Sequence, residues 1–150
     1  MKILVIHGPN MNLLGLREPD IYGKTTYAEL LEMIQGWARA LDLEVAFFQS
    51  NHEGALVDAI QEACGNYDGI ILNPAAYTHT SIAIPDALRA VGLPAVEVHI
   101  SDPATREPYR RISYTAPACA ISYSGLGPAG YQKALCFLKT LLITKGGSVL

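Results

Sequence analysis

Short apolar runs alternate with helix-length periodic segments along the chain, and this alternation restricts the possible folds more than any other feature. The apolar runs are brief and rich in β-branched residues, as buried strands are. We place strands at residues 2–7, 44–49, 69–72, 95–100 and 119–122. Strands that alternate with helices pair in parallel, so the chain is predicted to be an α/β protein.

Helix signals lie between and after these strands. Thr26 and Glu29 fit a capping box at the start of a first helix. Further helices are expected after Asn51, over about residues 81–91 and over 131–144. This order of elements predicts a flavodoxin-like, doubly wound five-stranded parallel sheet of order 2-1-3-4-5, with helices on both faces. There is no repeat or linker-like segment, so residues 1–150 are expected to form a single domain.

Composition narrows the function classes. The formal net charge of −3, without any Lys/Arg tract, argues against nucleic acid and favours a small-molecule substrate. Cys64, Cys119 and Cys136 show neither paired nor metal-like spacing, so we expect reduced thiols and no metal site. The apolar run at residues 1–6 is too short for a signal sequence or a membrane span. We therefore expect a soluble, cytoplasmic protein with no membrane partner.

Polar segments follow the predicted strands, and in an open parallel sheet ligands bind beyond the carboxyl ends of the strands. A long connection, residues 8–23, follows the first strand, residues 73–81 follow the third, and residues 101–107 follow the fourth. Glu97 and His99 lie two apart on the fourth strand, so their side chains should share one face. Together these segments predict one polar pocket.

Four separated motifs carry a more specific signal. They are Gly8-Pro9-Asn10 with Arg17-Glu18-Pro19 and Tyr22-Gly23, then Gln49 to Gly54, then Asn73 to Ser81, then Glu97 to Ser101 with Arg106, Glu107 and Arg110. In this order and spacing they resemble the type II 3-dehydroquinate dehydratases, from residue 1 to about residue 140. The chain departs from the family's common pattern at three positions without an assigned catalytic role: His7, Asp102 and Ile112.

The resemblance implies a lyase without cofactor or metal that removes water from 3-dehydroquinate to give 3-dehydroshikimate. The reaction is an anti elimination through an enolate. Tyr22 is matched to the general base, and Arg17 to the cation that favours its tyrosinate form. His99 is matched to the general acid, and Glu97 can hold its ring and favour the protonated form. Asn10 is matched to a supporting role at the enolate oxygen or a water.

The same resemblance assigns substrate binding to six further positions: Asn73, His79, Asp86, Ile100, Ser101 and Arg110. Backbone amides act at Ile100 and Ser101, and Asp86 reaches the site of a neighbouring subunit. The expected assembly is therefore a homododecamer built as a tetramer of trimers. Arg106 is expected to be structural or supporting and stays outside this set. The reaction would serve the shikimate pathway, which leads to aromatic amino acids, or quinate breakdown.

Ordinary structural explanations stay open for single residues. Asn73 before Pro74 also signals a turn, and Tyr22 with Arg17 would equally fit a surface aromatic and a solvated charge. A flavodoxin-like redox or signalling module and a catalytically silent metabolite-binding protein are the alternative functions. The run Gly125–Gly130 has dinucleotide-loop spacing, but it follows the last predicted strand, so we expect it to serve packing.

Overall fold

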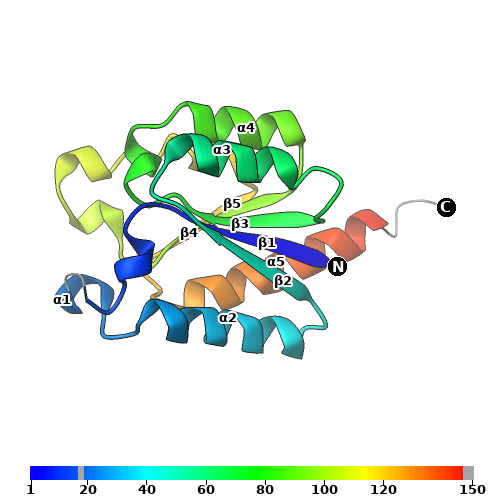
Figure 1. Cartoon of the computed structure of the whole chain (residues 1–150), viewed down its shortest axis with the longest axis horizontal. Coiled ribbons are helices and arrows are strands. Elements are labelled where there is room, and N and C mark those ends of the chain that lie inside the picture. The colour runs from blue at the N-terminus through cyan, green and yellow to red at the C-terminus, as the bar shows by residue number, and fades with distance from the viewer. Residues whose placement is uncertain (17–18, 147–150) are drawn as a thin grey trace.

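The computed structural model describes residues 1–16 and 19–146, and its centre is a five-stranded parallel sheet (Figure 1). The strands are β1 (Lys2–His7), β2 (Glu44–Gln49), β3 (Gly69–Asn73), β4 (Ala95–His99) and β5 (Ile121–Ser124). Their order is β2-β1-β3-β4-β5, and all four neighbouring pairs are parallel. The predicted fold class and strand order are therefore confirmed.

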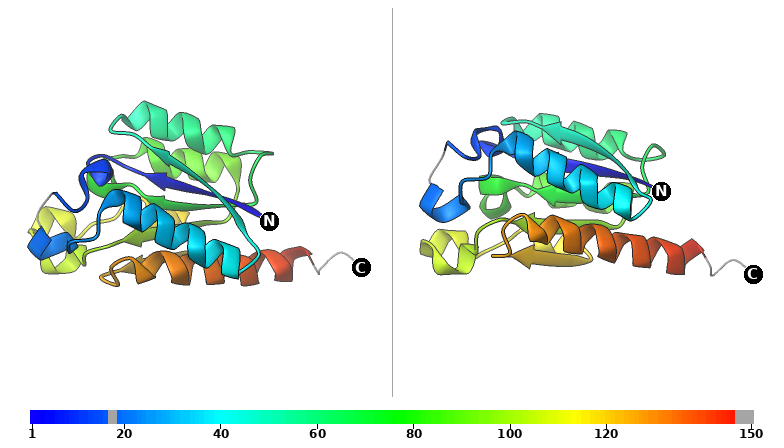
Figure 2. Two further views of the ribbon diagram at one scale, coloured as in Figure 1. Left: turned by 60° about the horizontal axis from the view of Figure 1, so that its bottom comes forward. Right: turned by 90° about the horizontal axis from the view of Figure 1, so that it is seen from below.

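Helices cover both faces of the sheet. The four long ones are α2 (Tyr27–Ala40), α3 (Glu53–Glu62), α4 (Ala83–Val91) and α5 (Ala129–Gly146). Figures 1 and 2 show α2 and α5 side by side on one face and α3 with α4 on the other. One short helix, α1 (Pro19–Tyr22), was not predicted and lies in the long connection after β1. No helix in the described part of the chain is long and apolar enough to cross a membrane.

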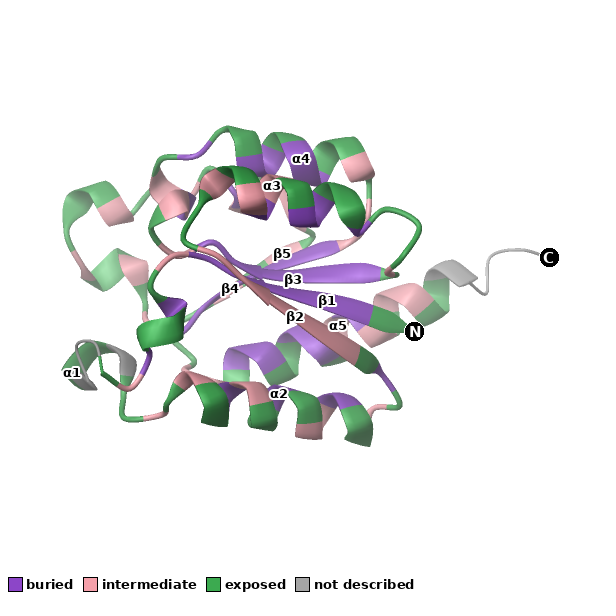
Figure 3. Ribbon diagram, viewed as in Figure 1, coloured by how far each residue is buried: buried purple, intermediate pink, exposed green. Residues whose placement is uncertain are grey.

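The sheet buries apolar side chains on both faces, as a sheet between two helical layers must. Alternate residues of β1 go to opposite sides: Ile3 and Val5 pack with α2 and α5, while Leu4 and Ile6 pack with α3 and α4. In Figure 3 the central strands are buried along almost their whole length, whereas the edge strand β2 is only half-buried. This two-sided burial explains why the strands read as continuous apolar runs.

The capping box at the start of α2 is confirmed in full. The Thr26 hydroxyl oxygen accepts the Glu29 backbone N–H at 3.2 Å, and the Glu29 carboxylate accepts the Thr26 backbone N–H at 2.7 Å. Each contact satisfies a donor at the helix N-terminus that has no partner within the helix. The first helix therefore begins where the sequence placed it.

The boundaries of the last strand were wrong by two residues. β5 covers residues 121–124 instead of 119–122, because a short 3₁₀ helix, Ala116–Ala118, precedes it. Ala118 and Cys119 donate their backbone N–H groups back to Thr115 and Ala116, so these groups are not available to the sheet. β4 ends at His99, one residue early, and α4 begins at Ala83 instead of residue 81.

A close backbone contact joins the segments that follow β1 and β3. The Gly8 N–H donates to the Asn73 carbonyl oxygen at 2.8 Å. A Cβ atom at Gly8 would lie 2.6 Å from the carbonyl carbon of Pro74, closer than any van der Waals contact allows. Glycine at this position therefore lets the two loops meet at the carboxyl edge of the sheet.

We predict that Gly8→Ala forces these two loops apart and destabilises the fold. Overpacking of this kind lowers the free energy of unfolding by about 1–3 kcal/mol, which urea unfolding measures. Gly54→Ala is the matched control, because Gly54 lies in α3 with open space around its would-be Cβ. If both variants unfold at the same urea concentration as the unmodified protein, the contact with Pro74 is not a constraint.

Candidate active site

A polar cavity of about 50 Å³ lies beyond the carboxyl ends of the central strands. Six of its lining residues are positions predicted from the sequence: Asn73, His79, His99, Ile100, Ser101 and Arg110. They come from the ends of β3 and β4 and from the 3₁₀ helices Ala75–His79 and Pro108–Arg110. Parallel pairing brings these strand ends to one edge, so residues far apart in the chain meet there. A second cavity, of about 160 Å³, shares His79, His99 and Arg110.

The Glu97–His99 pair stands at the end of β4, and its contact agrees with the predicted shared face. His99 Nε2 lies 3.1 Å from Glu97 Oε1, although the atoms are not well aligned for a hydrogen bond, so the contact is chiefly ionic when the ring is protonated. Glu97 is 1% exposed, and burial by itself raises the pKa of a carboxyl group. Here His99 and the hydroxyls of Ser122 and Ser113 outweigh burial and hold the pKa of Glu97 below its usual value. The pair therefore contains a buried carboxylate beside a ring that can carry a proton.

The His79 ring is oriented by a backbone group. Its Nδ1 lies 2.7 Å from the Ile112 carbonyl oxygen. Because a carbonyl oxygen only accepts, Nδ1 carries a proton, which leaves Nε2 free to face a ligand. The departure at Ile112 is accounted for in this way, since the contact uses its main chain while its side chain is largely exposed.

The amide of Asn73 is held inside the protein. Its Oδ1 accepts the Ala75 backbone N–H at 3.1 Å, and its Nδ2 donates to the Tyr131 hydroxyl oxygen at 3.2 Å. The side chain therefore has a fixed orientation at the cavity wall. Nδ2 also donates to Met11 Sδ at 3.5 Å. The predicted turn at Asn73 and a binding role are compatible, because the turn contact uses one lone pair of Oδ1 and leaves the other for a ligand.

The glycine run after β5 supports the loop after β4. Gly127 donates its N–H to the Ile100 carbonyl oxygen at 3.0 Å, and Gly125 donates to the Ser101 carbonyl oxygen at 3.1 Å. Both glycines have positive φ, of 57° and 73°. These contacts fix the peptide groups at Ile100 and Ser101, which agrees with the predicted packing role of the run.

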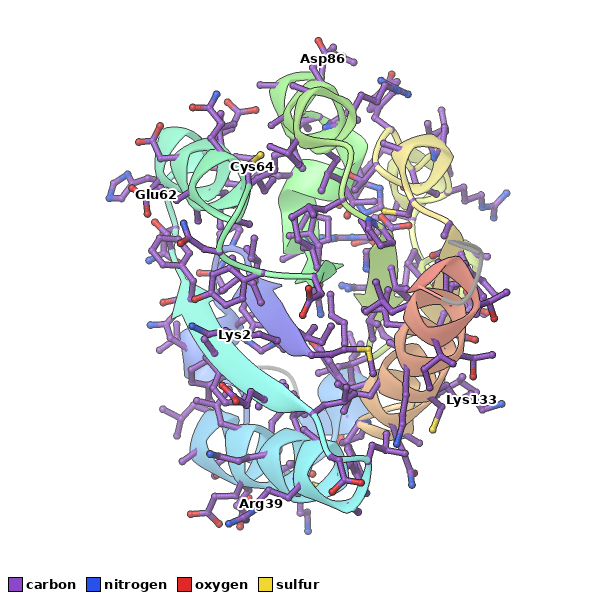
Figure 4. All side chains as sticks on the ribbon, turned by 90° about the vertical axis from the view of Figure 1, so that its right-hand side faces the viewer. Lys2, Arg39, Glu62, Cys64, Asp86 and Lys133 are labelled. Carbon is purple, nitrogen blue, oxygen red and sulfur yellow. The ribbon has the colours of Figure 1, made fainter. Side chains whose placement is uncertain are left out.

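Four predicted site residues are not brought into the cavity by the described part of one chain. Asn10 is exposed in a left-handed conformation, with φ 66°, and its backbone N–H donates to Asn51 Oδ1. Asp86 lies on the outer side of α4 (Figure 4), where Arg89 contacts it at 3.3 Å. Arg17 lies outside the described residues, and the same holds for the side chain of Tyr22, whose backbone ends α1.

Sequence reasoning missed three residues. Arg106 lines the cavity and its side chain is only 12% exposed, although we had left it outside the site. Its place in the loop directly after the fourth strand was the signal that could have found it. Ser113 and Ser122 contact Glu97 from segments that carried no signal at all.

His7 is buried at the end of β1, next to Asn73 in the sheet. Its Nδ1 lies 3.0 Å from the Tyr27 hydroxyl oxygen, and its ring packs edge-on against the rings of Tyr27 and Tyr131. Burial lowers the pKa of His7 to about 3, so the ring is neutral near pH 7. The departure at His7 thus places an uncharged polar ring beside Asn73.

The described residues offer little for metal or thiol chemistry. They contain no group of three or more His, Cys, Asp or Glu side chains placed to hold a metal ion. Cys64, Cys119 and Cys136 are free thiols. Burial raises the pKa of the Cys119 thiol to about 12, so it is not a thiolate nucleophile near neutral pH.

We predict that His7 makes the folded state sensitive to acid. The pKa is about 3 in the folded state and 6.5 in the ordinary state, so only the unfolded chain binds the proton between these values. The stability is complete above pH 6.5 and falls with decreasing pH, by about 1.4 kcal/mol per pH unit for one proton. We expect the free energy of unfolding, measured with urea between pH 6.5 and 4, to fall less steeply with decreasing pH in His7→Asn than in the unmodified protein.

His52→Asn serves as the control for this slope, because His52 is an exposed histidine at the start of α3. It should keep the acid sensitivity of the unmodified protein. Equal slopes in the unmodified protein and in His7→Asn would contradict the assigned burial of a neutral ring.

Comparisons with known proteins identify the family of this chain. The family model described as Dehydroquinase class II matches residues 1–139. A Campylobacter hominis protein named 3-dehydroquinate dehydratase is 56% identical over 135 residues, covering 90% of this chain and 87% of that protein. A Neosartorya fischeri protein named Catabolic 3-dehydroquinase 1 is 53% identical over 134 residues, or 89% of each chain.

A solved structure gives the same result in three dimensions. The crystal structure of type II dehydroquinase from Butyrivibrio crossotus superimposes with a TM-score of 0.90 at 51% sequence identity. The match covers 92% of this chain and 97% of that one. The chain therefore belongs to the dehydroquinase class II family.

Proposed function

We propose that this protein is a type II 3-dehydroquinate dehydratase, a hydro-lyase that converts 3-dehydroquinate into 3-dehydroshikimate and water. The observation that carries the proposal is the Glu97–His99 pair at a cavity that also collects Asn73, His79 and Arg110. A proton donor beside several hydrogen-bonding groups suits the removal of a hydroxyl from a polyhydroxylated carboxylic acid. One matching relative is named 3-dehydroquinate dehydratase and another Catabolic 3-dehydroquinase 1, and in this proposal the reaction serves either shikimate synthesis or quinate breakdown.

Substrate binding divides between backbone and side chains in this proposal. The substrate carboxylate accepts from the backbone N–H groups at Ile100 and Ser101 and from the Ser101 hydroxyl. The substrate hydroxyls are oriented by Asn73, His79 and Arg110. Support comes from the fixed Ile100–Ser101 peptide group, which carries the Ser101 N–H, and from the held amide of Asn73.

The elimination then proceeds in two proton transfers. The Tyr22 tyrosinate, favoured by the Arg17 cation, takes the proton from the carbon next to the ketone, and the electron pair forms an enolate. Asn10 donates to the enolate oxygen or to a water there. The enolate then reforms the ketone, the neighbouring carbon–oxygen bond breaks, and His99 protonates the departing hydroxyl to give water. The product is a conjugated enone, formed on the anti course that the family implies.

Assembly completes the site in this proposal. Within one chain Asp86 points outward from α4 and does not line the cavity, so in this proposal it contacts the substrate in the site of a neighbouring subunit. The homododecamer expected from the family would supply that neighbour. We further propose a cytoplasmic location.

We expect the purified protein, mixed with 3-dehydroquinate and no added metal or nucleotide, to form product at once. The measurement is the rise in ultraviolet absorbance of the conjugated enone. Borohydride treatment should not abolish the rate, because no lysine imine takes part. Folded protein that binds 3-dehydroquinate and forms no product would instead support the catalytically silent binding protein.

The variants Tyr22→Phe and His99→Ala test the two proton-transfer roles. Each should lower kcat by at least about 100-fold, because each removes a proton-transfer group. Tyr67→Phe and His52→Ala are the matched controls, since both residues lie outside the cavity. Near-normal turnover in Tyr22→Phe or His99→Ala, at an unchanged unfolding temperature, would exclude the corresponding role.

A further inference from the structure

Two serine hydroxyls from segments distant in the chain enclose the Glu97 carboxylate. Ser113 Oγ lies 2.9 Å from Oε1, and Ser122 Oγ lies 2.9 Å from Oε2. His99 Nε2 contacts Oε1 at 3.1 Å. Each carboxylate oxygen is thus within hydrogen-bond distance of one hydroxyl. Glu97 itself is buried, whereas Ser113 is half-buried and Ser122 is exposed.

The hydrogen bonds of Ser113 set the direction of its proton. The backbone N–H of Ala116 donates to Ser113 Oγ at 2.9 Å, and an amide N–H can only donate. The hydroxyl hydrogen of Ser113 therefore points to Glu97 Oε1, which accepts the hydrogen bond. A carboxylate accepts at both oxygens, whereas a protonated carboxyl group would need one oxygen to donate. Ser113 thus occupies Oε1 as an acceptor and leaves Oε2 as the position for a proton, while a Ser122 hydroxyl that donates to Oε2 stabilises the ionised form.

Ser122 has its position fixed by strand pairing. It is the register partner of Glu97 in the parallel β4–β5 pair, so both side chains leave the sheet on the same face. Ser124, two residues further along β5, is the register partner of His99 and has no hydrogen bond to Glu97 among the described contacts. The two serines thus differ chiefly in this one contact.

We propose that Ser122 and Ser113 are positioning residues, which keep Glu97 ionised and fixed against the His99 ring. Neither serine lines the cavity that contains Asn73 and Ser101, and both line the adjacent cavity with Glu97 and His99. Their hydrogen bonds go to Glu97, so they act on His99 through that carboxylate. The consequence for catalysis rests on the proposed function, in which His99 delivers the proton to the leaving hydroxyl. A misplaced or neutral Glu97 would hold the His99 ring less well during this proton transfer.

Several titratable or charged groups surround this carboxylate, and a test must leave these residues unchanged. Besides His99, they are His79, Asp102, Arg110 and Arg111 around the adjacent cavity, and Cys119 before β5. None of them is altered by substituting the two serines. A change in the titration of Glu97 after such a substitution is therefore assigned to the lost hydroxyl.

Infrared titration tests the effect of the two serine hydroxyls on Glu97 and does not require catalysis. The carboxylic-acid C=O band of Glu97 is identified by its absence from Glu97→Gln, or by its shift in Glu97→Asp if the first variant does not fold. Hydroxyl donors stabilise the ionised form, so their removal raises the pKa of Glu97. The acid band should therefore appear at higher pH in Ser122→Ala, and at still higher pH when Ser113→Ala is added. An unchanged titration would overturn the proposal.

Steady-state kinetics tests the consequence for turnover. Ser122→Ala should lower kcat about tenfold, as expected for the loss of one hydrogen bond to a charged group, and should leave KM within about twofold. Ser122→Thr keeps a hydroxyl at the same strand position and should restore most of kcat. Ser124→Ala, the matched control, should behave as the unmodified protein.

The two measurements separate this proposal from the proposed function. If the unmodified protein does not dehydrate 3-dehydroquinate but the Glu97 band still shifts in Ser122→Ala, the proposed function is wrong. The stabilisation of ionised Glu97 by the serine hydroxyls is then still supported. If the unmodified protein is active and Ser122→Thr is no better than Ser122→Ala, the hydroxyl has no positioning role. A loss in Ser124→Ala equal to that in Ser122→Ala would likewise overturn the proposal.

Discussion

The parallel pairing of β1, β3 and β4 is the constraint on which the site depends. It brings His7, Asn73 and His99, from three separate stretches of the chain, to the same edge of one sheet. The loops that leave this edge then need to pass close to one another, and Gly8 allows the tightest of these approaches. The polar groups stand on strand ends and short helices, so their relative positions follow from the backbone more than from flexible side chains.

The burial of Glu97 shows how a charge is kept inside such a frame. An isolated carboxylate would take up a proton there, because leaving water penalises the ionised form. Three neighbours reverse that preference, and each is supplied by a different part of the fold: β4 itself, β5 and the segment before the 3₁₀ helix at residues 116–118. The edge strand β5 thus contributes to the chemistry of its neighbour as well as to the sheet.

The sequence was sufficient where a local pattern determines a local structure. Alternating apolar runs predicted the strand order, and Thr26 with Glu29 predicted a helix start to the residue. The shared face of Glu97 and His99 followed from strand periodicity in the same way. Ser113 and Ser122 could not be found like this, because their contact with Glu97 depends on which strands are neighbours and in what register. The low pKa of His7 likewise depends on enclosure by Tyr27 and Tyr131, which are 20 or more positions away in the chain.

The orientation of His79 depends on the main-chain oxygen of Ile112, an atom that every amino acid possesses. Substitution at this position can therefore change size, charge and polarity while the ring stays in place. This contact therefore does not restrict the residue type at position 112, as long as the path of the backbone is kept. A comparison of residue types alone would miss this contact, because it does not depend on the side chain at position 112.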